Sequence, residues 1–495
     1  MLNKPRDDDD DAKDNEVILS KNANIDQEIT MGFDENSSLS PYEEKAPATH
    51  DYNKIQIPDG GYGWVVVGCY FFLNFCTWGS NAGFAIYLTY YLDSNKFPGG
   101  TKEDFAAVGG LAFGAGLMFA PLINYFVFRT SVKTSIGAGI VLQGAALLLC
   151  AFSTKLWQVF LTQGLLISFG LAFISIPATN ILTPWFRKKR TLALGLGAAG
   201  SGLGGVVFNL GMQRILEIKS LRWALISQCI IDTVLSTIAL MLIRTRETAV
   251  QETTKEKPKF FDPSLLRHYV VWFLILFVGT TMLGYVVLLY SLSAFTVSLG
   301  YTQKQGSVVS CMISAGGCAF RPLVGYCADR FGPVTVGIVV HAIVGILCVA
   351  MWIPCRNLAT AIAFSLLSGA LMGSIWPLLT SISSRIGGLN KLASIYSFTW
   401  PCVGMCAIVS PIIGLKLRSN DPTVSNAYVN TVIFSGMGYF GAALFLWLIR
   451  GYLIARDKLA IAAKTGHDDG ELHLRVSVPD FLKELFNIGR LPRKV

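Results

Sequence analysis

Apolar stretches of about 20 or more residues recur along most of this chain, from Tyr62 to about residue 454. A helix of about 20 residues spans the hydrocarbon core of a bilayer, which is roughly 30 Å thick. Because 52% of the 495 residues are apolar and only 15% are charged, the composition lies outside that of ordinary soluble domains. The sequence therefore predicts an all-α polytopic membrane protein.

Apolar windows predict twelve transmembrane helices, near residues 62–92, 104–128, 132–153, 156–181, 191–213, 222–244, 267–293, 304–327, 333–354, 358–384, 394–417 and 428–454. The longest hydrophilic break between them, residues 245–260, separates two sets of six. The expected parts are a disordered acidic cytosolic tail (1–53), an N-terminal six-helix bundle (54–244), a cytosolic linker (245–266), a C-terminal six-helix bundle (267–454) and a cytosolic C-terminal tail (455–495).

The two sets of helices resemble each other. The second span ends in "FAPLINY" at 119–125 and the eighth in "FRPLVGY" at 320–326, and "SIP" at 175–177 in the fourth span is matched by "SIWP" at 374–377 in the tenth. These matches at nearly one offset predict two pseudo-symmetric bundles. Such halves rocking about a midplane site are the architecture of alternating-access transport.

Charge indicates how the chain lies across the membrane. Residues 1–53 hold 14 acidic and 5 basic side chains, a net charge of −9; because the whole chain carries +9, the remaining residues carry +18. The acidic segment is too polar to bury a core, and the basic remainder suits anionic lipid headgroups without a nucleic-acid partner. Loops on the side of the tails hold 15 basic residues against 10 on the other side. The positive-inside rule then predicts that both tails are cytosolic.

Metal and cofactor sites are not expected. The 11 cysteines form no C-x-x-C pair, and cysteine inside apolar spans behaves as a small hydrophobe. "GLGAAG" at 195–200 fits the dinucleotide fingerprint in letters, yet it lies in an apolar helix and not after a strand. Its small residues, with Ala193 and Gly204, instead allow close helix contacts. No span places a nucleophile, a base and an orienting group in the order of an enzyme.

The stretch "PDGGYGW" opens the first span. Asp59 is expected to cap the free N–H groups of the helix that follows, and Tyr62 and Trp64 are expected at headgroup depth. A role of Asp59 in gating is the alternative.

Three motifs carry a family resemblance: "DGGYGW" at 59–64, "WFRKKRTLALGLGAAGSGLGG" at 185–205, and "GYCADRFG" at 325–332. Together they resemble the monocarboxylate permease family of the major facilitator superfamily, in its fungal branch, over about residues 57–455. The resemblance implies the major facilitator fold, secondary transport of a small organic solute, and residence in the plasma membrane.

Arg321 is the principal candidate for binding the solute. A guanidinium inside a span costs at least about 2.5 kcal/mol on insertion scales, and the repeat-equivalent residue in the other half is Ala120. A fixed cation facing a cavity can bind a carboxylate through paired hydrogen bonds, and the family resemblance assigns that role to this arginine. Snorkelling toward the cytosol, or bonds to backbone carbonyls, is the structural alternative.

The chain departs from the proton-coupled lactate carriers of that family at two places. The carboxylate expected one turn before the arginine is replaced by Gly317, and "WGSNAG" at 78–83 contains no lysine. Either another acid couples a proton or the protein is a uniporter. Asp232 in the sixth span is the candidate proton site, with pairing to nearby hydroxyls as its alternative, and His341 is interpreted as a structural residue.

Four further side chains are candidates for lining the cavity. Asn74 and Asn81 belong to the first span, which borders the cavity in this fold, and Trp376 and Trp400 offer either stacking faces or packing. Asp329 and Arg330 are expected to hold the cytosolic gate through charge contacts, or else to form a solvated loop pair.

These observations favour a secondary transporter of a monocarboxylate-like anion, with or without a proton. The alternatives are a facilitator for a larger metabolite such as riboflavin, suggested by the tryptophans and the missing lysine and acid, and a membrane sensor that signals through its tails.

Overall fold

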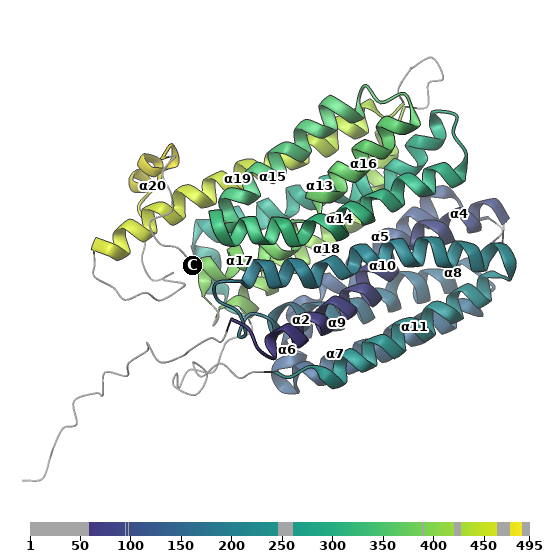
Figure 1. Ribbon diagram of the computed structural model, residues 1–495, viewed down its shortest axis with the longest axis horizontal. Coiled ribbons are helices and arrows are strands. Elements are labelled where there is room, and N and C mark those ends of the chain that lie inside the picture. Colours follow the sequence, from purple (N-terminus) through teal and green to yellow (C-terminus); the bar gives the residue numbers. More distant parts are fainter. Residues whose placement is uncertain are drawn as a thin grey trace, which may run out of the picture. The chain divides into compact units, whose positions relative to one another are not determined.

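The computed structural model describes residues 59–94, 96–97, 99–245, 261–388, 391–419, 427–462 and 476–487 (Figure 1). The expected acidic tail (1–53), most of the expected linker (245–266) and parts of the C-terminal tail lie outside the described residues. All regular structure within these ranges is helical.

Within the described residues, the first half contains α2 (Gly63–Asn74), the π-helical η2 (Phe75–Gly79), α3 (Ser80–Ala82), α4 (Phe84–Ser94), α5 (Lys102–Met118), α6 (Ala120–Arg129), α7 (Val132–Ala151), α8 (Leu156–Val159), the π-helical η3 (Phe160–Leu166), α9 (Ile167–Ile181), α10 (Arg190–Ile218) and α11 (Leu221–Leu242). The second half contains η4 (Pro263–Arg267), α13 (Tyr269–Ser298), α14 (Gln303–Phe331), α15 (Pro333–Leu347), η5 (Cys348–Trp352), α16 (Leu358–Met372), α17 (Ile375–Gly387), α18 (Leu392–Lys416), α19 (Val429–Ala462) and α20 (Val478–Leu485).

Ten helical stretches of the described residues are long and apolar enough to cross a membrane, and α5 with α6, bent by 48°, makes an eleventh. The expected first span, 62–92, differs from these because it is not one continuous α-helix. It consists of α2, η2, α3 and α4, with a turn at Gly83. The expected first span is thus present as a series of short segments, and its irregular part lies next to the central cavities described below.

Side-chain exposure shows which helix faces meet lipid. Met241 on α11 is 76% exposed and Val141 on α7 is 70% exposed, whereas Ser365 and Ser368 on α16 are fully buried. Large apolar side chains thus face outward while small polar ones pack between helices. This arrangement suits a hydrocarbon solvent, where interhelical contacts rely on close packing and hydrogen bonds.

The two halves meet along α10 with α14 and along α5 with α18 (Figure 1). Glycines bring these backbones together. A Cβ at Gly114 would overlap the carbonyl oxygen of Gly404, and one at Gly202 would lie 2.5 Å from the Cys318 nitrogen. On another face of α10, a Cβ at Gly200 would overlap the carbonyl oxygen of Phe71 in α2. The close helix contacts expected for the glycine-rich stretch are confirmed, and this helix makes them with both halves.

Candidate functional site

The opening motif of the first span packs against the loop that precedes α10. Tyr62 lies 6.0 Å from Trp185 between ring centroids, and Trp64 lies 5.0 Å from Phe186, edge to face. A Cβ at Gly63 would come within 3.1 Å of the Phe186 ring. Two of the motifs that carry the family resemblance are therefore the two sides of one contact.

The expectation that Asp59 caps α2 is wrong. One of its carboxylate oxygens accepts hydrogen bonds from the backbone N–H groups of Arg187 at 2.7 Å, Lys188 at 2.8 Å and Lys189 at 3.4 Å, and α2 has no side-chain cap. Asp59 adopts φ = +46°, a conformation that the short polar side chains of Asp and Asn tolerate better than most. The tight entry serves to aim the carboxylate at the neighbouring loop.

Asp329 binds the same segment from the other half. Its two carboxylate oxygens accept from the N–H groups of Thr191 at 2.9 Å and Leu192 at 2.8 Å. These are free N–H groups in the first turn of α10, which favour a negative charge through the helix dipole. Asp329 thus acts as the N-terminal cap of a helix that belongs to the opposite half.

The structure corrects the expected role of Arg330. Its side chain is exposed, and its guanidinium lies 5.6 Å from the ring of Phe331. Within the described residues it forms no ion pair with the first half. Of this Asp-Arg pair, only Asp329 contacts the first half, and it does so through hydrogen bonds from backbone N–H groups and not through an ion pair.

Further hydrogen bonds join the halves at the same end, which we call the tail-side end: the end where α2 and α10 begin and α14 ends. Arg190 Nη1 donates to Ser384 Oγ at 2.9 Å, and Asn124 Nδ2 donates to Ser397 Oγ at 2.9 Å. The hydroxyls of Thr191 and Ser381 lie 2.8 Å apart. Together with the Asp329 bonds, these hydrogen bonds join the two halves at the tail-side end.

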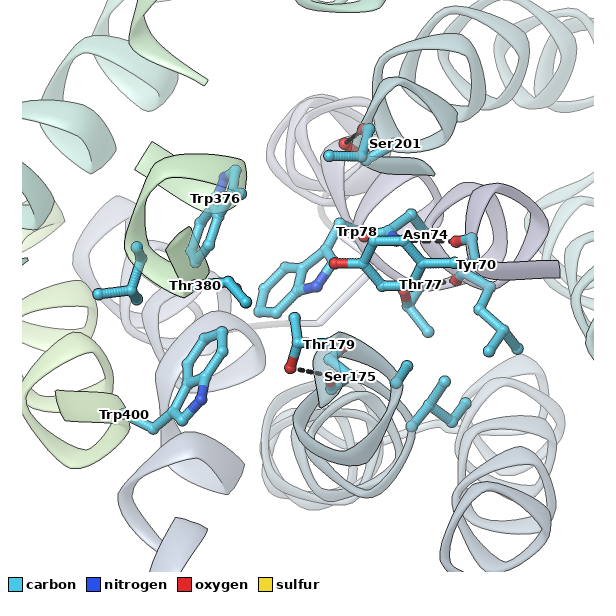
Figure 2. A pocket seen from close by; sticks show the side chains of 15 residues that line it. Tyr70, Asn74, Thr77, Trp78, Ser175, Thr179, Ser201, Trp376, Thr380 and Trp400 are labelled. Atoms are coloured by element: carbon cyan, nitrogen blue, oxygen red, sulfur yellow. Dashed lines mark hydrogen bonds between the residues drawn. The ribbon is translucent and has the colours of Figure 1, made fainter. Parts of the chain in front are cut away.

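Two adjacent cavities lie between the halves. The tail-side cavity is lined by Tyr70, Leu73, Asn74, Thr77, Trp78, Ile174, Ser175, Ala178, Thr179, Ala198, Ser201, Trp376, Leu379, Thr380 and Trp400 (Figure 2). The far-side cavity is lined by Trp78, Asn81, Ala82, Phe113, Ser201, Gly202, Tyr285, Leu289, Tyr290, Ile313, Ser314, Arg321, Gly369, Met372 and Trp376. The second set lies farther along α10 and along the first span from the tail-side end, which gives the cavities their order.

Both cavities are narrow. The volume open to the centre of a water molecule is about 20 Å³ in the tail-side cavity and about 40 Å³ in the far-side cavity, enough for one or a few waters. An organic solute requires the halves, or the side chains between the cavities, to move.

Three tryptophan rings form a row that begins at the boundary between the cavities: Trp78 and Trp376 line both cavities, and Trp400 lines only the tail-side one. Trp78 and Trp376 stack at 5.6 Å with an interplanar angle of 21°, and Trp376 and Trp400 stack at 5.9 Å and 14° (Figure 2). Trp78 comes from η2 in the first half, so the row crosses the interface. Sequence reasoning named Trp376 and Trp400 and missed Trp78. The sequence feature that could have identified Trp78 is its position in "WGSNAG", one helical turn before the candidate Asn81.

Arg321 lines the far-side cavity and is 7% exposed. Its Nη1 donates to the Ala198 carbonyl at 2.7 Å and to the Ser201 hydroxyl, both on α10 of the other half. Its Nε has no hydrogen-bond partner, and no carboxylate pairs with it, among the residues that the structure describes. The bonds to a backbone carbonyl and a hydroxyl agree with a structural role for Arg321, whereas its position beside a cavity agrees with a role in binding the solute.

Glycines make room for this guanidinium. A Cβ at Gly373, between α16 and α17, would overlap it, and a Cβ at Gly317, one turn earlier on α14, would lie 3.3 Å from its Nε. A side chain at either position would therefore meet Arg321. Position 317 is therefore within reach of the arginine.

Asn74 and Asn81 lie along different cavities. Asn74 Nδ2 donates to the Tyr70 carbonyl of its own helix at 2.8 Å, beside the tail-side cavity, and Asn81 borders the far-side cavity. In the tail-side cavity, Ser175 Oγ and Trp400 Nε1 have no partner within the described part of the chain. These two polar atoms remain available to water or solute.

Asp232 lines neither cavity. It is buried inside the first half, where Ser80 Oγ donates to its Oδ2 at 2.6 Å, so the expected pairing with a hydroxyl is present. His341 Nδ1 donates a hydrogen bond to the Gly337 carbonyl oxygen at 2.8 Å, and the His341 and Phe277 ring centroids lie 5.2 Å apart. Over the described ranges, no group of three or more His, Cys, Asp or Glu side chains could hold a metal ion.

The chain matches a known protein family and two yeast transporters. Residues 67–411 match the family model "Major Facilitator Superfamily". "Probable transporter MCH2" of Saccharomyces cerevisiae is 55% identical over 442 residues, covering 89% of this chain and 93% of that protein. "Uncharacterized transporter ESBP6" of the same yeast is 30% identical over 410 residues, covering 80% of this chain and 60% of that protein.

Solved structures show the same fold. The crystal structure of FucP in its outward conformation superposes with a TM-score of 0.56 at 15% identity, covering 76% of this chain and 98% of that chain. A double-tryptophan mutant of XylE gives a TM-score of 0.63 at 12% identity, covering 78% and 94%. The predicted all-helical membrane fold is confirmed. The chain belongs to the major facilitator superfamily, and it is an integral membrane secondary transporter and not an enzyme.

Proposed function

We propose that this transporter carries a small monocarboxylate-like anion by alternating access. Arg321 is the observation that supports it: a buried cation at a cavity between the halves, without a carboxylate partner in the described ranges. A permanent charge in such a place is costly unless it is compensated. An anionic solute supplies the compensation, and a planar guanidinium can bind its carboxylate through two hydrogen bonds.

The cycle we propose uses the two cavities and the gate. The solute enters the far-side cavity and its carboxylate replaces Ser201 and the Ala198 carbonyl as the partner of Arg321. Asn81 and Trp376 border the same space, and Asn74 and Trp400 line the continuation toward the tail-side end. Release on that side requires the row of tryptophans to part.

Asp59 and Asp329 form the gate in this proposal. Both hold the segment 187–192, one from each half, so rocking of the halves must break the Asp329 bonds while the Asp59 bonds persist. If the tails are cytosolic, as the basic loops predict, the bonded state is closed to the cytosol. It then corresponds to an outward-facing or occluded state.

The domain bounds, the side of the tails and the membrane of residence belong to the same proposal. Bundles at 54–244 and 267–454, a linker at 245–266, cytosolic tails at 1–53 and 455–495, and residence in the plasma membrane follow from the sequence and the family resemblance. The monocarboxylate permease branch is supported by the mutual packing of its two N-terminal motifs. Because Gly317 stands where the family's proton-coupled carriers have a carboxylate, and 78–83 contains no lysine, any coupled ion must bind a group other than the one that those carriers use.

The test is uptake of labelled monocarboxylates and of riboflavin, at acidic and neutral external pH, in cells expressing the intact chain, Arg321→Ala, Arg321→Lys or Arg330→Ala. Arg330 lies nine residues farther along the same helix and is exposed, so its variant is the matched control. We expect acid uptake that is lost in Arg321→Ala, reduced in Arg321→Lys and retained in Arg330→Ala. Acid uptake that survives Arg321→Ala contradicts the proposal.

Riboflavin is the second candidate, and the row of tryptophans favours it. A flavin ring can stack on an indole face, and the unpaired Ser175 Oγ and Trp400 Nε1 offer polar contacts beside it. Saturable riboflavin uptake without acid transport at either pH, reduced in Trp400→Ala, would establish this function and make Arg321 a gate residue.

A further inference from the structure

A buried polar cluster occupies the interior of the first half, outside both cavities. Asp232 on α11 accepts at Oδ2 from Ser80 Oγ at 2.6 Å and from Gln143 Nε2 at 3.2 Å. Gln228 Nε2 donates to Ser80 Oγ at 2.5 Å, and the Tyr87 hydroxyl, Oη, donates to Gln228 Oε1 at 2.5 Å. The cluster thus joins α3, α4, α7 and α11 around a single acid that is 2% exposed.

No cation among the described residues compensates a negative charge on Asp232. The titratable groups that face it are Cys76 from η2, Tyr87 from α4 and Cys229 from its own helix. All of them are neutral or negative, and α7 contributes only the amide of Gln143. A lone carboxylate in such surroundings is far more costly than the neutral acid.

The hydrogen-bond pattern leaves room for a proton. Asp232 Oδ1 and Gln143 Oε1 are both buried acceptors without a partner in the described part of the chain. The neutral acid is a donor as well as an acceptor, so a proton on Oδ1 turns one of two unpaired acceptors into a donor.

The cluster is attached to the irregular part of the first span. Ser80 follows directly after η2, and Gln143 Nε2 donates both to Asp232 and, at 2.6 Å, to the Cys76 carbonyl of η2. The same π-helical segment carries Trp78, which stacks on Trp376 across the interface. π-helical turns inside α-helices frequently mark functional sites.

We propose that Asp232 is the proton-binding site of this transporter and that its protonation sets the geometry of η2, and thereby the position of Trp78 between the cavities. Asp232 takes a proton from water on one side of the membrane and returns it to water after the halves rock. The proposal rests on solute transport by the chain, and it does not depend on the solute being a carboxylate.

Infrared difference spectroscopy of the bilayer-reconstituted protein tests proton binding without any solute. We expect a pH-dependent carboxylic-acid carbonyl band, sensitive to exchange into D₂O, that is lost in Asp232→Asn. Glu217→Gln, which removes an exposed acid of α10, is the matched control and should keep the band. Identical spectra for the intact protein and Asp232→Asn overturn the proposal.

Tryptophan fluorescence of the same samples tests the link to η2. We expect a change with pH that follows the infrared band, is lost in both Asp232→Asn and Trp78→Phe, and persists in Glu217→Gln. Ser80→Ala removes a donor to the carboxylate and should move the midpoint of both signals to higher pH, which a purely structural cluster would not do. A fluorescence change that survives in Asp232→Asn overturns the coupling.

Transport separates this inference from the proposed function. For any monocarboxylate or riboflavin that the intact protein carries, Asp232→Asn should lose acid stimulation of net uptake while keeping solute counterflow. Unchanged acid stimulation in the variant overturns the inference and leaves the assignment of the solute intact. Failure of every solute in the panel refutes the proposed function, and the two spectroscopic results still decide the role of Asp232.

Discussion

Replacing Asp329 by asparagine should open the tail-side end. The carboxylate accepts two hydrogen bonds, at 2.9 and 2.8 Å, from the first turn of α10 in the opposite half. Bonds to a charged group contribute about 1.5–3 kcal/mol each and neutral bonds about 0.5–1.5 kcal/mol, and an amide has only one oxygen. Allowing for partial exposure, we expect the closed state to lose about 2 kcal/mol, a roughly 30-fold shift in the equilibrium between closed and open gates.

Hydrogen–deuterium exchange of the reconstituted protein measures this shift at the affected amides. Peptides that contain Thr191 and Leu192 should exchange roughly 30-fold faster in Asp329→Asn, if exchange follows gate opening. Arg330→Gln changes the adjacent exposed charge and should leave the exchange unchanged. Asp59→Asn should affect residues 187–189 first, since its bonds lie within one half. Equal exchange in the intact protein and Asp329→Asn, or a larger effect of Arg330→Gln, would refute the assignment of Asp329 as a gate residue.

Three further outcomes are expected. Gly200→Ala places a methyl group on a backbone carbonyl of the first span and should abolish monodisperse expression, whereas Gly211→Ala, with nothing within 4 Å of its Cβ, should not. Gly317→Asp puts a carboxylate beside Arg321. It should inhibit acid uptake at neutral pH and relieve that inhibition at acidic pH, while Gly317→Asn should show no such pH dependence. The third outcome concerns the C-terminal helix α20. A hydrogen bond from Lys458 of α19 holds the pKa of Glu484 on α20 below its ordinary value. This contribution to docking of α20 is present above the unfolded pKa and is lost as the pH falls through the lower folded value, so α20 should become more susceptible to proteolysis in acid, and Glu484→Gln should reproduce that at neutral pH.

The sequence was most informative where the polarity of a residue differs from that of its neighbours. Arg321 is conspicuous because a charge inside an apolar span has a large energetic cost, and it lies beside a cavity. Trp78 was not conspicuous, because it is one of 10 tryptophans in the chain and its stacking partner Trp376 is almost 300 residues away. The partners of Asp59 were missed for a related reason: a local cap is the usual role of such a residue, and the actual acceptor–donor pairing joins positions 128 residues apart.

Local physics therefore determined the class of this protein from the sequence alone. Long apolar stretches require helices in a bilayer, basic loops indicate sidedness, and repeated motifs indicate two related halves. Which residues face a cavity, which helices meet across the halves and which N–H groups an aspartate caps were decided only by the tertiary structure. Inside a membrane both the lipid-facing and the buried faces of a helix are largely apolar, so the strong hydrophobic periodicity that would orient a helix in water is weakened. Close packing at glycines and long-range hydrogen bonds set the orientation instead.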